Sequence, residues 1–382
     1  MAPNKIIIDT DPGVDDVLAM LLAFSAKYEE LDILMLSLTF GNVQVQQPLG
    51  FETLDVRKPI DETWKSLFVP RPENLSADEA AALVAVKEKH KLFVPSLKPA
   101  YQVMLELLAE NEPDTVTIVA IGPLTNLALA AAKDTETFLR VKEVVVMGGA
   151  VDAPGNMTPG AEFNTYADSI ASARVFALTS PNPRMTMPPG LQHHTKEQLP
   201  PYPEKLSKQL TIKLFPLGKS LHSGVHPYIT EQHLLPASLF TKHTTTPSLG
   251  QSPLVSWVTP FLTATFEKIR SLNPQQDPSN MGLQLHDPLT VWYASCAANP
   301  AWTFQTEDLR VETSGQWTRG CIVADRRGRP ITEGNTDLSE EVVGDEGGWR
   351  DSRKGNRVAW CTASPGVHVF AEHILKRIFG EV

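Results

Sequence analysis

The sequence predicts an α/β fold, a single domain with a mostly parallel, open sheet flanked by helices. Apolar, β-rich runs bounded by turn residues recur along the chain, each followed by a stretch that can form a helix; they cover residues 5–8, 33–38, 117–121 and 144–147. The last run is hydrophobic without alternation, which is typical of a parallel strand covered on both faces. Because ligands bind beyond the carboxyl ends of such strands, the residues after each run are candidate site residues.

The second half of the chain is expected to add helices and a smaller β-rich part. The expected helices cover residues 253–270, 288–298 and 367–379. Residues 302–360 contain short β-like pieces, 309–312 and 321–324, between Gly-, Arg- and Glu-rich loops, which predicts a small β-rich C-terminal elaboration. No internal repeat or clear linker is visible, so residues 1–382 are expected to form one domain.

Composition excludes several classes of function. The chain has 382 residues, is 42% hydrophobic and 20% charged, and carries a formal net charge of -10, which argues against a large basic surface for nucleic acid. Cys296, Cys321 and Cys361 lack metal-binding or disulfide spacing and are expected to be reduced thiols. The apolar run that begins at Lys5 leaves no room for a signal peptide, and no stretch of about 18 apolar residues suggests a membrane span. A cytoplasmic location is therefore expected.

An acidic cluster follows the first predicted strand. Four carboxylates lie within a short stretch before a helix, namely Asp9, Asp11, Asp15 and Asp16. Like charges held close together raise each other's pKa unless a cation neutralises them. A capped helix explains one aspartate but not four. Ligands that are all oxygen atoms point to a hard cation, Ca²⁺ or Mg²⁺, rather than to zinc.

The stretch 9–16, Asp-Thr-Asp-Pro-Gly-Val-Asp-Asp, closely resembles the signature of the inosine–uridine preferring nucleoside hydrolase family. Further segments resemble that family's motifs in the same order, at residues 39–43, 122–126, 147–149, 155–156, 162–164 and 286–288. The sequence of residues 163–168, Phe-Asn-Thr-Tyr-Ala-Asp, is most similar to that of the family's fungal branch, which includes uridine and purine nucleosidases. The resemblance implies the family's Rossmann-like fold and hydrolysis of ribonucleosides to free base and ribose.

The resemblance also implies a metal centre. It places Ca²⁺ on Asp11, Asp16, the backbone carbonyl of Thr125 and Asp287, with a metal-bound water whose proton passes to Asp11. A cation lowers the pKa of water beside a carboxylate base, so both groups are needed.

The substrate implied by the resemblance is a small-molecule ribonucleoside, bound through its sugar. The implied ribose ligands are Asp15, Asn42, Asn156, Glu162, Asn164 and Asp287. A site that hydrogen-bonds each hydroxyl rejects analogues that lack one, so deoxynucleosides are expected to be poor substrates. His286 is expected either to protonate or hydrogen-bond the leaving base or to position Asp287, and both roles stay open. A homo-oligomer is also left open.

One departure from the family pattern concerns residues 43–61. The family carries a further helix, a strand and a His-Gly loop in this part of the chain, but this sequence has no His-Gly dipeptide. Either coding sequence is absent from this chain, or the protein is a paralogue that has lost part of its pocket. The intact metal-binding positions favour the first explanation.

Two alternatives to a nucleoside hydrolase follow. The first is a catalytically impaired homologue that binds a nucleoside or ribose without turnover. The second is a phosphatase with an aspartate nucleophile after its first strand, for which Asp9 and Asp11 are superficially suitable. Against a phosphatase, the Asp15-Asp16 pair is the wrong continuation, and no motif places a phosphate-binding Lys or Arg.

Overall fold

The architecture comes from a computed structural model, which describes residues 3–42, 96, 98–188, 199–217, 233–246, 249, 252–275, 281–328, 331 and 344–381. Its centre is a seven-stranded sheet with the strand order β2-β1-β3-β4-β5-β11-β8. The strands are β1 (Asn4–Thr10), β2 (Leu31–Leu38), β3 (Val116–Ala120), β4 (Glu143–Ala150), β5 (Ile212–Leu217), β11 (Val358–Ala363) and β8 (Thr303–Glu307). All neighbours pair in parallel except β8, which runs antiparallel to β11 at one edge.

The predicted α/β fold class is confirmed, and each of the four predicted strands is present. The central strands are buried along almost their whole length, because helices cover both faces of the sheet. β5, β8 and β11 were not predicted as strands of this sheet. β8 and β11 lie at the two ends of the region expected to be a β-rich elaboration, so these ends are part of the main sheet.

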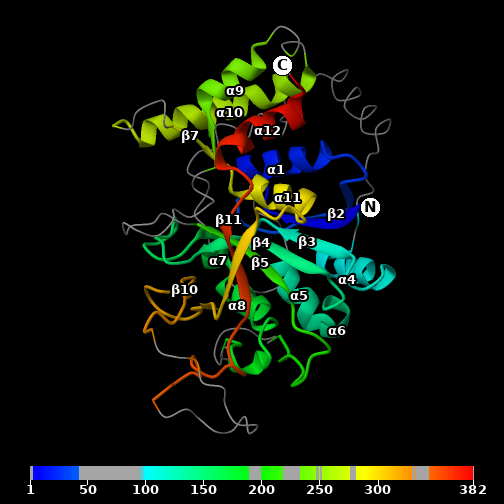
Figure 1. Cartoon of the computed structure of the whole chain (residues 1–382), viewed down its shortest axis with the longest axis vertical. Helices are drawn as coiled ribbons and strands as arrows, with labels where there is room; N and C mark the ends of the chain where they lie inside the picture. Colours follow the sequence, from blue (N-terminus) through cyan, green and yellow to red (C-terminus); the bar gives the residue numbers. More distant parts are fainter. Residues whose placement is uncertain are drawn as a thin grey trace, which may run out of the picture.

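Two helical layers enclose the sheet (Figure 1). One layer packs into a hydrophobic core with α1 (Val14–Phe24), α10 (Pro253–Leu272), α11 (His286–Cys296) and α12 (Val367–Phe379). The other contains α4 (Ala100–Glu110), α5 (Thr125–Lys133) and α8 (Ser169–Ala177). The first layer joins the two ends of the chain, since α1 contacts α11 and α12.

Smaller elements complete the described part of the chain. They are α6 (Thr135–Phe138), α7 (Phe163–Ala167), a 3₁₀ turn at Pro183–Met185, α9 (Ala237–Thr244), and the antiparallel pairs β6 (Leu234–Pro236) with β7 (Gly282–Gln284) and β9 (Arg310–Val311) with β10 (Ile322–Val323). β9 and β10 confirm the β-like pieces predicted there. Among the described helices, none is long and apolar enough to cross a bilayer.

The sheet topology fixes where a ligand can bind. β1 lies between β2 and β3, so the chain passes from β1 to β2 on one side and later returns to β3 on the other side of β1. The carboxyl ends of β1 and β3 therefore form a topological switch point, where parallel α/β sheets open a crevice for ligands. The segment predicted to lack a family element, residues 43–61, lies outside the described residues.

Candidate functional site

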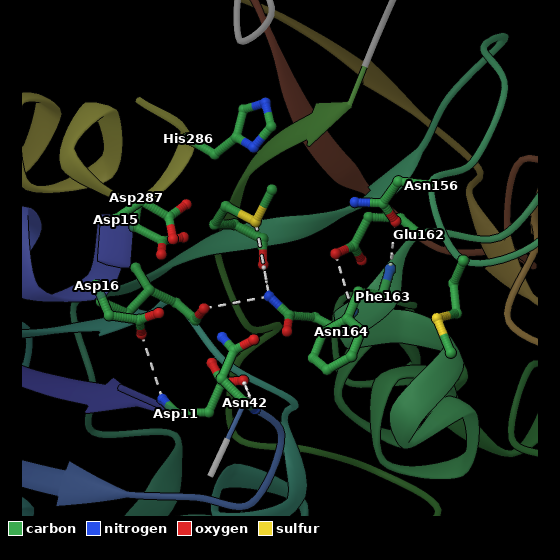
Figure 2. A pocket seen from close by; sticks show the side chains of 13 residues that line it. Asp11, Asp15, Asp16, Asn42, Asn156, Glu162, Phe163, Asn164, His286 and Asp287 are labelled. Atoms are coloured by element: carbon green, nitrogen blue, oxygen red, sulfur yellow. Dashed lines mark hydrogen bonds between the residues drawn. The ribbon is translucent and has the colours of Figure 1, made fainter. Parts of the chain in front are cut away.

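A pocket of about 280 Å³ opens at this switch point (Figure 2). This volume is close to the lower end of small-molecule sites, which begin at roughly 300 Å³. Predicted site residues that line it are Asp11, Asp15, Asp16, Asn42, Asn156, Glu162, Asn164, His286 and Asp287. Ile121, Met147, Met157 and Phe163 also line the pocket and were not predicted as site residues.

Asp11 follows β1 and is held on several sides. Its Oδ2 accepts a hydrogen bond from the backbone N–H of Asn42 at 2.7 Å, and its own N–H donates to Oδ1 of Asp16 at 3.3 Å. A Cβ added to Gly41 would meet Asp11 Oδ2 at 2.0 Å, and one added to Gly122 would meet Asp11 Oδ1 at 2.8 Å. The two glycines therefore allow the loops after β2 and β3 to close around a buried carboxylate.

Asp16 belongs to the first turn of α1 and faces back toward β1. Its Oδ1 accepts from the hydroxyl of Thr10, and its Oδ2 accepts from the backbone N–H of Gly13 at 2.9 Å. Such a carboxylate satisfies free N–H groups at a helix N-terminus. These contacts fix the orientation of Asp16 independently of any ligand.

Asp15, Asp16 and Asp287 form an acidic cluster in the pocket. One ligand oxygen from each lies within 4.8 Å of the others. Burial, followed by the charge of Asp16, raises the pKa of Asp15 to about 7. The pKa of Asp287 is raised well above its usual value by burial and then by the charges of Asp15 and Asp16. A cation would relieve this repulsion, and the all-oxygen donor set fits a hard one such as Ca²⁺ or Mg²⁺.

His286 opens α11 beside Asp287, and its imidazole is buried. Its Nε2 has no hydrogen-bond partner among the described residues. Burial, and then the nearby charge of His233, lowers the pKa of His286 to about 4. The ring is therefore neutral at neutral pH, with one nitrogen left for a ligand in the pocket.

Three further predicted residues lie on the opposite wall of the pocket, around α7 (Figure 2). Glu162 caps α7: its carboxylate accepts from the N–H groups of Asn164 at 2.8 Å and Thr165 at 3.1 Å, and from Gly149 at 2.7 Å. The Asn164 amide donates to the carbonyls of Ile121 and Met147. These bonds tie the opposite wall to the ends of β3 and β4.

Asn156 is exposed, and its Oδ1 accepts from the backbone N–H of Phe163 at 2.9 Å. Its NH₂ group is therefore the part of the side chain available to a ligand.

Thr125 is the predicted site residue that the pocket lining does not include. It begins α5 and is buried, and its hydroxyl donates to Oδ2 of Asp168 at 2.6 Å. A role for its backbone carbonyl stays a prediction.

A buried polar network beneath the pocket was not foreseen as such. Asn126 donates from Nδ2 to Asp9 Oδ1 at 2.9 Å, to Ser37 Oγ at 3.1 Å and to the Leu38 carbonyl at 3.0 Å. Ser37 also donates to Asp9. Burial raises the pKa of Asp9 to about 6, although the hydrogen bonds from Ser37 and Asn126 act to lower it. Asn126 and Asp9 therefore join α5, β1 and β2 below the pocket and do not line it.

Charge in the pocket bears on the phosphatase alternative. Among the described residues that line the pocket, none is Lys or Arg. Phosphoryl transfer needs cationic groups around the phosphate, so this lining gives a phosphatase no support.

Comparison with known proteins agrees with this geometry. The model of the family described as inosine-uridine preferring nucleoside hydrolase matches residues 6–350. The chain belongs to this family.

Three relatives of this nucleoside hydrolase family member are informative. Uridine nucleosidase 1 of Arabidopsis thaliana is 37% identical over 186 residues, 45% of this chain and 53% of the relative. An uncharacterized protein of Schizosaccharomyces pombe is 36% identical over 201 residues, 50% of this chain and 62% of that protein, in agreement with the fungal resemblance. A non-specific ribonucleoside hydrolase of Klebsiella pneumoniae is 28% identical over 350 residues, 88% of this chain and 93% of that relative. The chain thus matches little more than half the length of the first two.

The fold of this nucleoside hydrolase family member is also similar to that of a solved plant nucleoside hydrolase. The TM-score is 0.63 at 20% identity, and the match covers 99% of this chain and 100% of the other. The nucleoside hydrolase fold expected from the sequence is therefore confirmed.

Proposed function

We propose that this chain hydrolyses the N-glycosidic bond of ribonucleosides and releases free base and ribose. The observation that carries the proposal is the arrangement of the pocket, where a clamped carboxylate, a cluster of three more carboxylates and a neutral imidazole meet at the switch point. Hydrolysis of a glycosidic bond needs an activated water, stabilisation of an oxocarbenium-like sugar and assistance to the leaving group. The pocket offers groups for each need.

We propose Ca²⁺ as the cofactor, held by Asp11, Asp16, Asp287 and the backbone carbonyl of Thr125. The structure brings Asp16 and Asp287 together in the acidic cluster, and Asp11 is added from the family resemblance. Several carboxylates in one pocket suit Ca²⁺, which takes six to eight oxygen ligands, better than Mg²⁺, which keeps more of its waters. When bound, the cation lowers the pKa of a water in the pocket and offsets the repulsion within the acidic cluster.

The protein side chains have separate roles in this proposal. Asp11 accepts a proton from the attacking water, and the backbone N–H of Asn42 keeps its carboxylate in one orientation. His286, neutral and with a free Nε2, donates or accepts a hydrogen bond at the leaving base. Because the pKa of His286 is low, the ring is not an imidazolium at neutral pH. A hydrogen bond to the base is therefore favoured over transfer of a proton from an imidazolium.

The ribose is bound from both walls of the pocket. Asp15 and Asp287 face it from the helices α1 and α11, and Asn42 from the loop after β2. Asn156, Glu162 and Asn164 face it from around α7. Such a set of carboxylates and amides favours ribonucleosides over deoxynucleosides, because a missing hydroxyl leaves buried polar groups without partners.

Uridine is the first substrate to test, because relatives of this chain include a uridine nucleosidase and a non-specific ribonucleoside hydrolase. We also propose one domain, since a single sheet includes strands from β1 to β11. A cytoplasmic location and a homo-oligomeric state remain predictions from sequence and resemblance.

The decisive experiment measures release of free ribose from uridine, inosine and adenosine, with and without a Ca²⁺ chelator, for wild type and Asp11→Ala. Asp32→Asn is the control, because Asp32 pairs with Lys5 at the far end of the sheet from the pocket. We expect chelator-sensitive release that Asp11→Ala abolishes and Asp32→Asn retains. Binding of ribose and Ca²⁺ without release would instead support the impaired, nucleoside-binding alternative.

A further inference from the structure

The hairpin of β9 and β10 packs directly against the segment that forms the α7 wall of the pocket. Cys321, at the start of β10, forms an antiparallel bridge with Ala161. Ile322 lies against Gly149, where an added Cβ would meet its Cδ1 at 2.2 Å. Gly320 has a φ of +80°, and a Cβ there would meet the Tyr166 Cα at 2.7 Å. The hairpin is therefore in close backbone contact with the residues that carry Glu162 and Asn164.

Arg319 adds side-chain contacts across this interface to the backbone bridge of Cys321 with Ala161. Its guanidinium donates to the backbone carbonyl of Tyr166 and lies over the Tyr166 ring, 4.5 Å from the centroid. The loop that carries Arg319 is itself fixed, because the Arg319 N–H donates to Gly315 at 3.0 Å and the Gly320 N–H donates to Glu312 at 2.7 Å. A stacked guanidinium that also binds a carbonyl holds its partner more tightly than either contact alone.

The turn that Arg319 holds leads to two predicted site residues. Asp168 follows Tyr166 by two positions and links two helices. Its Oδ2 accepts from the Thr125 hydroxyl at 2.6 Å, and its Oδ1 accepts from the Ala171 N–H at 2.9 Å. The positive charge of Arg319 acts on the same carboxylate. A chain of contacts thus runs from Arg319 through the turn to Thr125, and through α7 to Asn164.

We propose that Arg319 is a positioning residue, which holds the Tyr166–Asp168 turn so that Asn164 stays oriented toward the pocket and Thr125 keeps its place at the start of α5. The inference rests on the proposed function for its effect on catalysis, but its structural effect is measurable without substrate. Partners that orient metal ligands in this indirect way typically contribute about 10-fold or more to metal affinity. The C-terminal hairpin would then be part of the site's framework.

The first test is amide hydrogen exchange of the ligand-free protein, comparing Arg319→Met with wild type. We expect faster exchange in α7 and at residues 166–168, and no change of this kind in Arg327→Met. Arg327 is the matched control because it lies on the same segment and pairs with Asp325 and Asp345 instead. Unchanged exchange at residues 163–168 in Arg319→Met would overturn the inference, whether or not the chain proves to be a hydrolase.

The second test measures Ca²⁺ affinity, KM and kcat. Arg319→Met should weaken Ca²⁺ binding by about 10-fold and raise KM, and Arg319→Lys should recover little, since lysine cannot stack and bind the carbonyl in the same way. Asp168→Asn keeps one acceptor oxygen for the α8 cap but loses the charge and the acceptor for the Thr125 hydroxyl, and it should be non-additive with Arg319→Met. Additive effects, or a loss of thermal stability with unchanged Ca²⁺ affinity and KM, would assign Arg319 a structural role only and overturn the inference.

If wild type binds Ca²⁺ but releases no ribose, the proposed function fails. The exchange and affinity comparisons still decide the role of Arg319.

Discussion

The backbone N–H of Asn42 donates to the Oδ2 atom of Asp11 over 2.7 Å, so the loop after β2 holds the carboxylate proposed as general base. Gly41 makes this approach possible, because a side chain there would collide with the same oxygen. The orientation of Asp11 therefore depends on two backbone positions of another strand's loop.

Gly41→Ala should displace the Asp11 carboxylate and lower kcat by about 100-fold, the loss typical of a misplacement of about 1 Å. Asn42→Ala is the matched variant: it keeps the backbone N–H that Asp11 accepts and removes only the side chain proposed to bind ribose. It should raise KM with a much smaller effect on kcat. Steady-state kinetics with uridine measure kcat and KM of the two variants. A wild-type kcat in Gly41→Ala would contradict the proposal that the loop after β2 holds the Asp11 carboxylate in place.

Ca²⁺ affinity should fall as the pH drops below about 7, because protons compete with the cation for Asp287, a proposed ligand, and also neutralise Asp15, whose negative charge beside it attracts the cation. The pKa of Asp15 is raised to about 7 and that of Asp287 well above its usual value. Binding should therefore release protons near neutral pH and release fewer at alkaline pH. Calorimetry in buffers of different ionisation enthalpy counts these protons, and proton-free binding near pH 6 would refute the prediction.

The stability of the cation-free protein should decrease as the pH rises from about 4 toward 7. Across that range the folded state keeps protons on Asp15 and Asp287 that the unfolded chain has already released. His286 has the opposite effect: its folded pKa of about 4 lies below its usual 6.5, so the stability it contributes is lost as the pH falls through this interval. Thermal unfolding with and without Ca²⁺ separates these effects. Added Ca²⁺ should remove the loss at rising pH that comes from Asp15 and Asp287, and it should leave the effects of Asp9 and His286 unchanged.

His286→Gln should lower kcat by about 100-fold or more, the usual contribution of a group that assists a proton transfer or leaving group. The shape of the pH profile between about pH 6 and 8 should stay the same, because the imidazole is already neutral there and the carboxylates titrate instead. If the acid limb of the kcat profile disappears in His286→Gln, the imidazole is protonated during turnover.

Asn126→Ala should destabilise the protein by about 1–3 kcal/mol, the cost of leaving buried polar groups without partners. Its amide joins Asp9 of β1 to Ser37 and the Leu38 carbonyl of β2, so two strands and α5 lose a common contact. Asn299→Ala is the control, since the exposed Asn299 side chain accepts a local hydrogen bond from the Ala301 N–H, and its backbone hydrogen bonds remain in the variant. Denaturant unfolding compares them, and equal midpoints would show that the network contributes little.

The sequence predicted β1 to β4 because buried parallel strands are continuous apolar runs. It predicted the site residues after these strands for the same reason, since strand ends converge at one edge of the sheet. It missed β5, which is also buried, since Lys213 and Pro216 interrupt its apolar run. β8, with the sequence Thr-Phe-Gln-Thr-Glu, lies at the edge and has half-exposed and exposed polar residues, so it gave no such signal. β11 pairs between β5 and β8, far from its sequence neighbours, and that pairing is set by tertiary packing.

The direction in which side chains point was also not predictable from the sequence. Asn126 stands in a motif that resembles a site motif, yet its amide points beneath the pocket to Asp9. Arg319 contacts Tyr166 across 153 residues of sequence, and no spacing rule connects two such distant segments. Burial and contact across the chain decide these cases, and a single sequence contains neither.

The acidic cluster takes Asp15 and Asp16 from near the start of the chain and Asp287 from its second half, and α1 packs on α11 and α12. During synthesis the first aspartates leave the ribosome long before the helix that supplies the third. Bringing Asp287 to Asp15 and Asp16 costs the chain loop-closure entropy, so we expect the pocket to form late in folding. Cation binding is therefore expected to report complete folding of the chain, since an N-terminal fragment would hold only part of the ligand set.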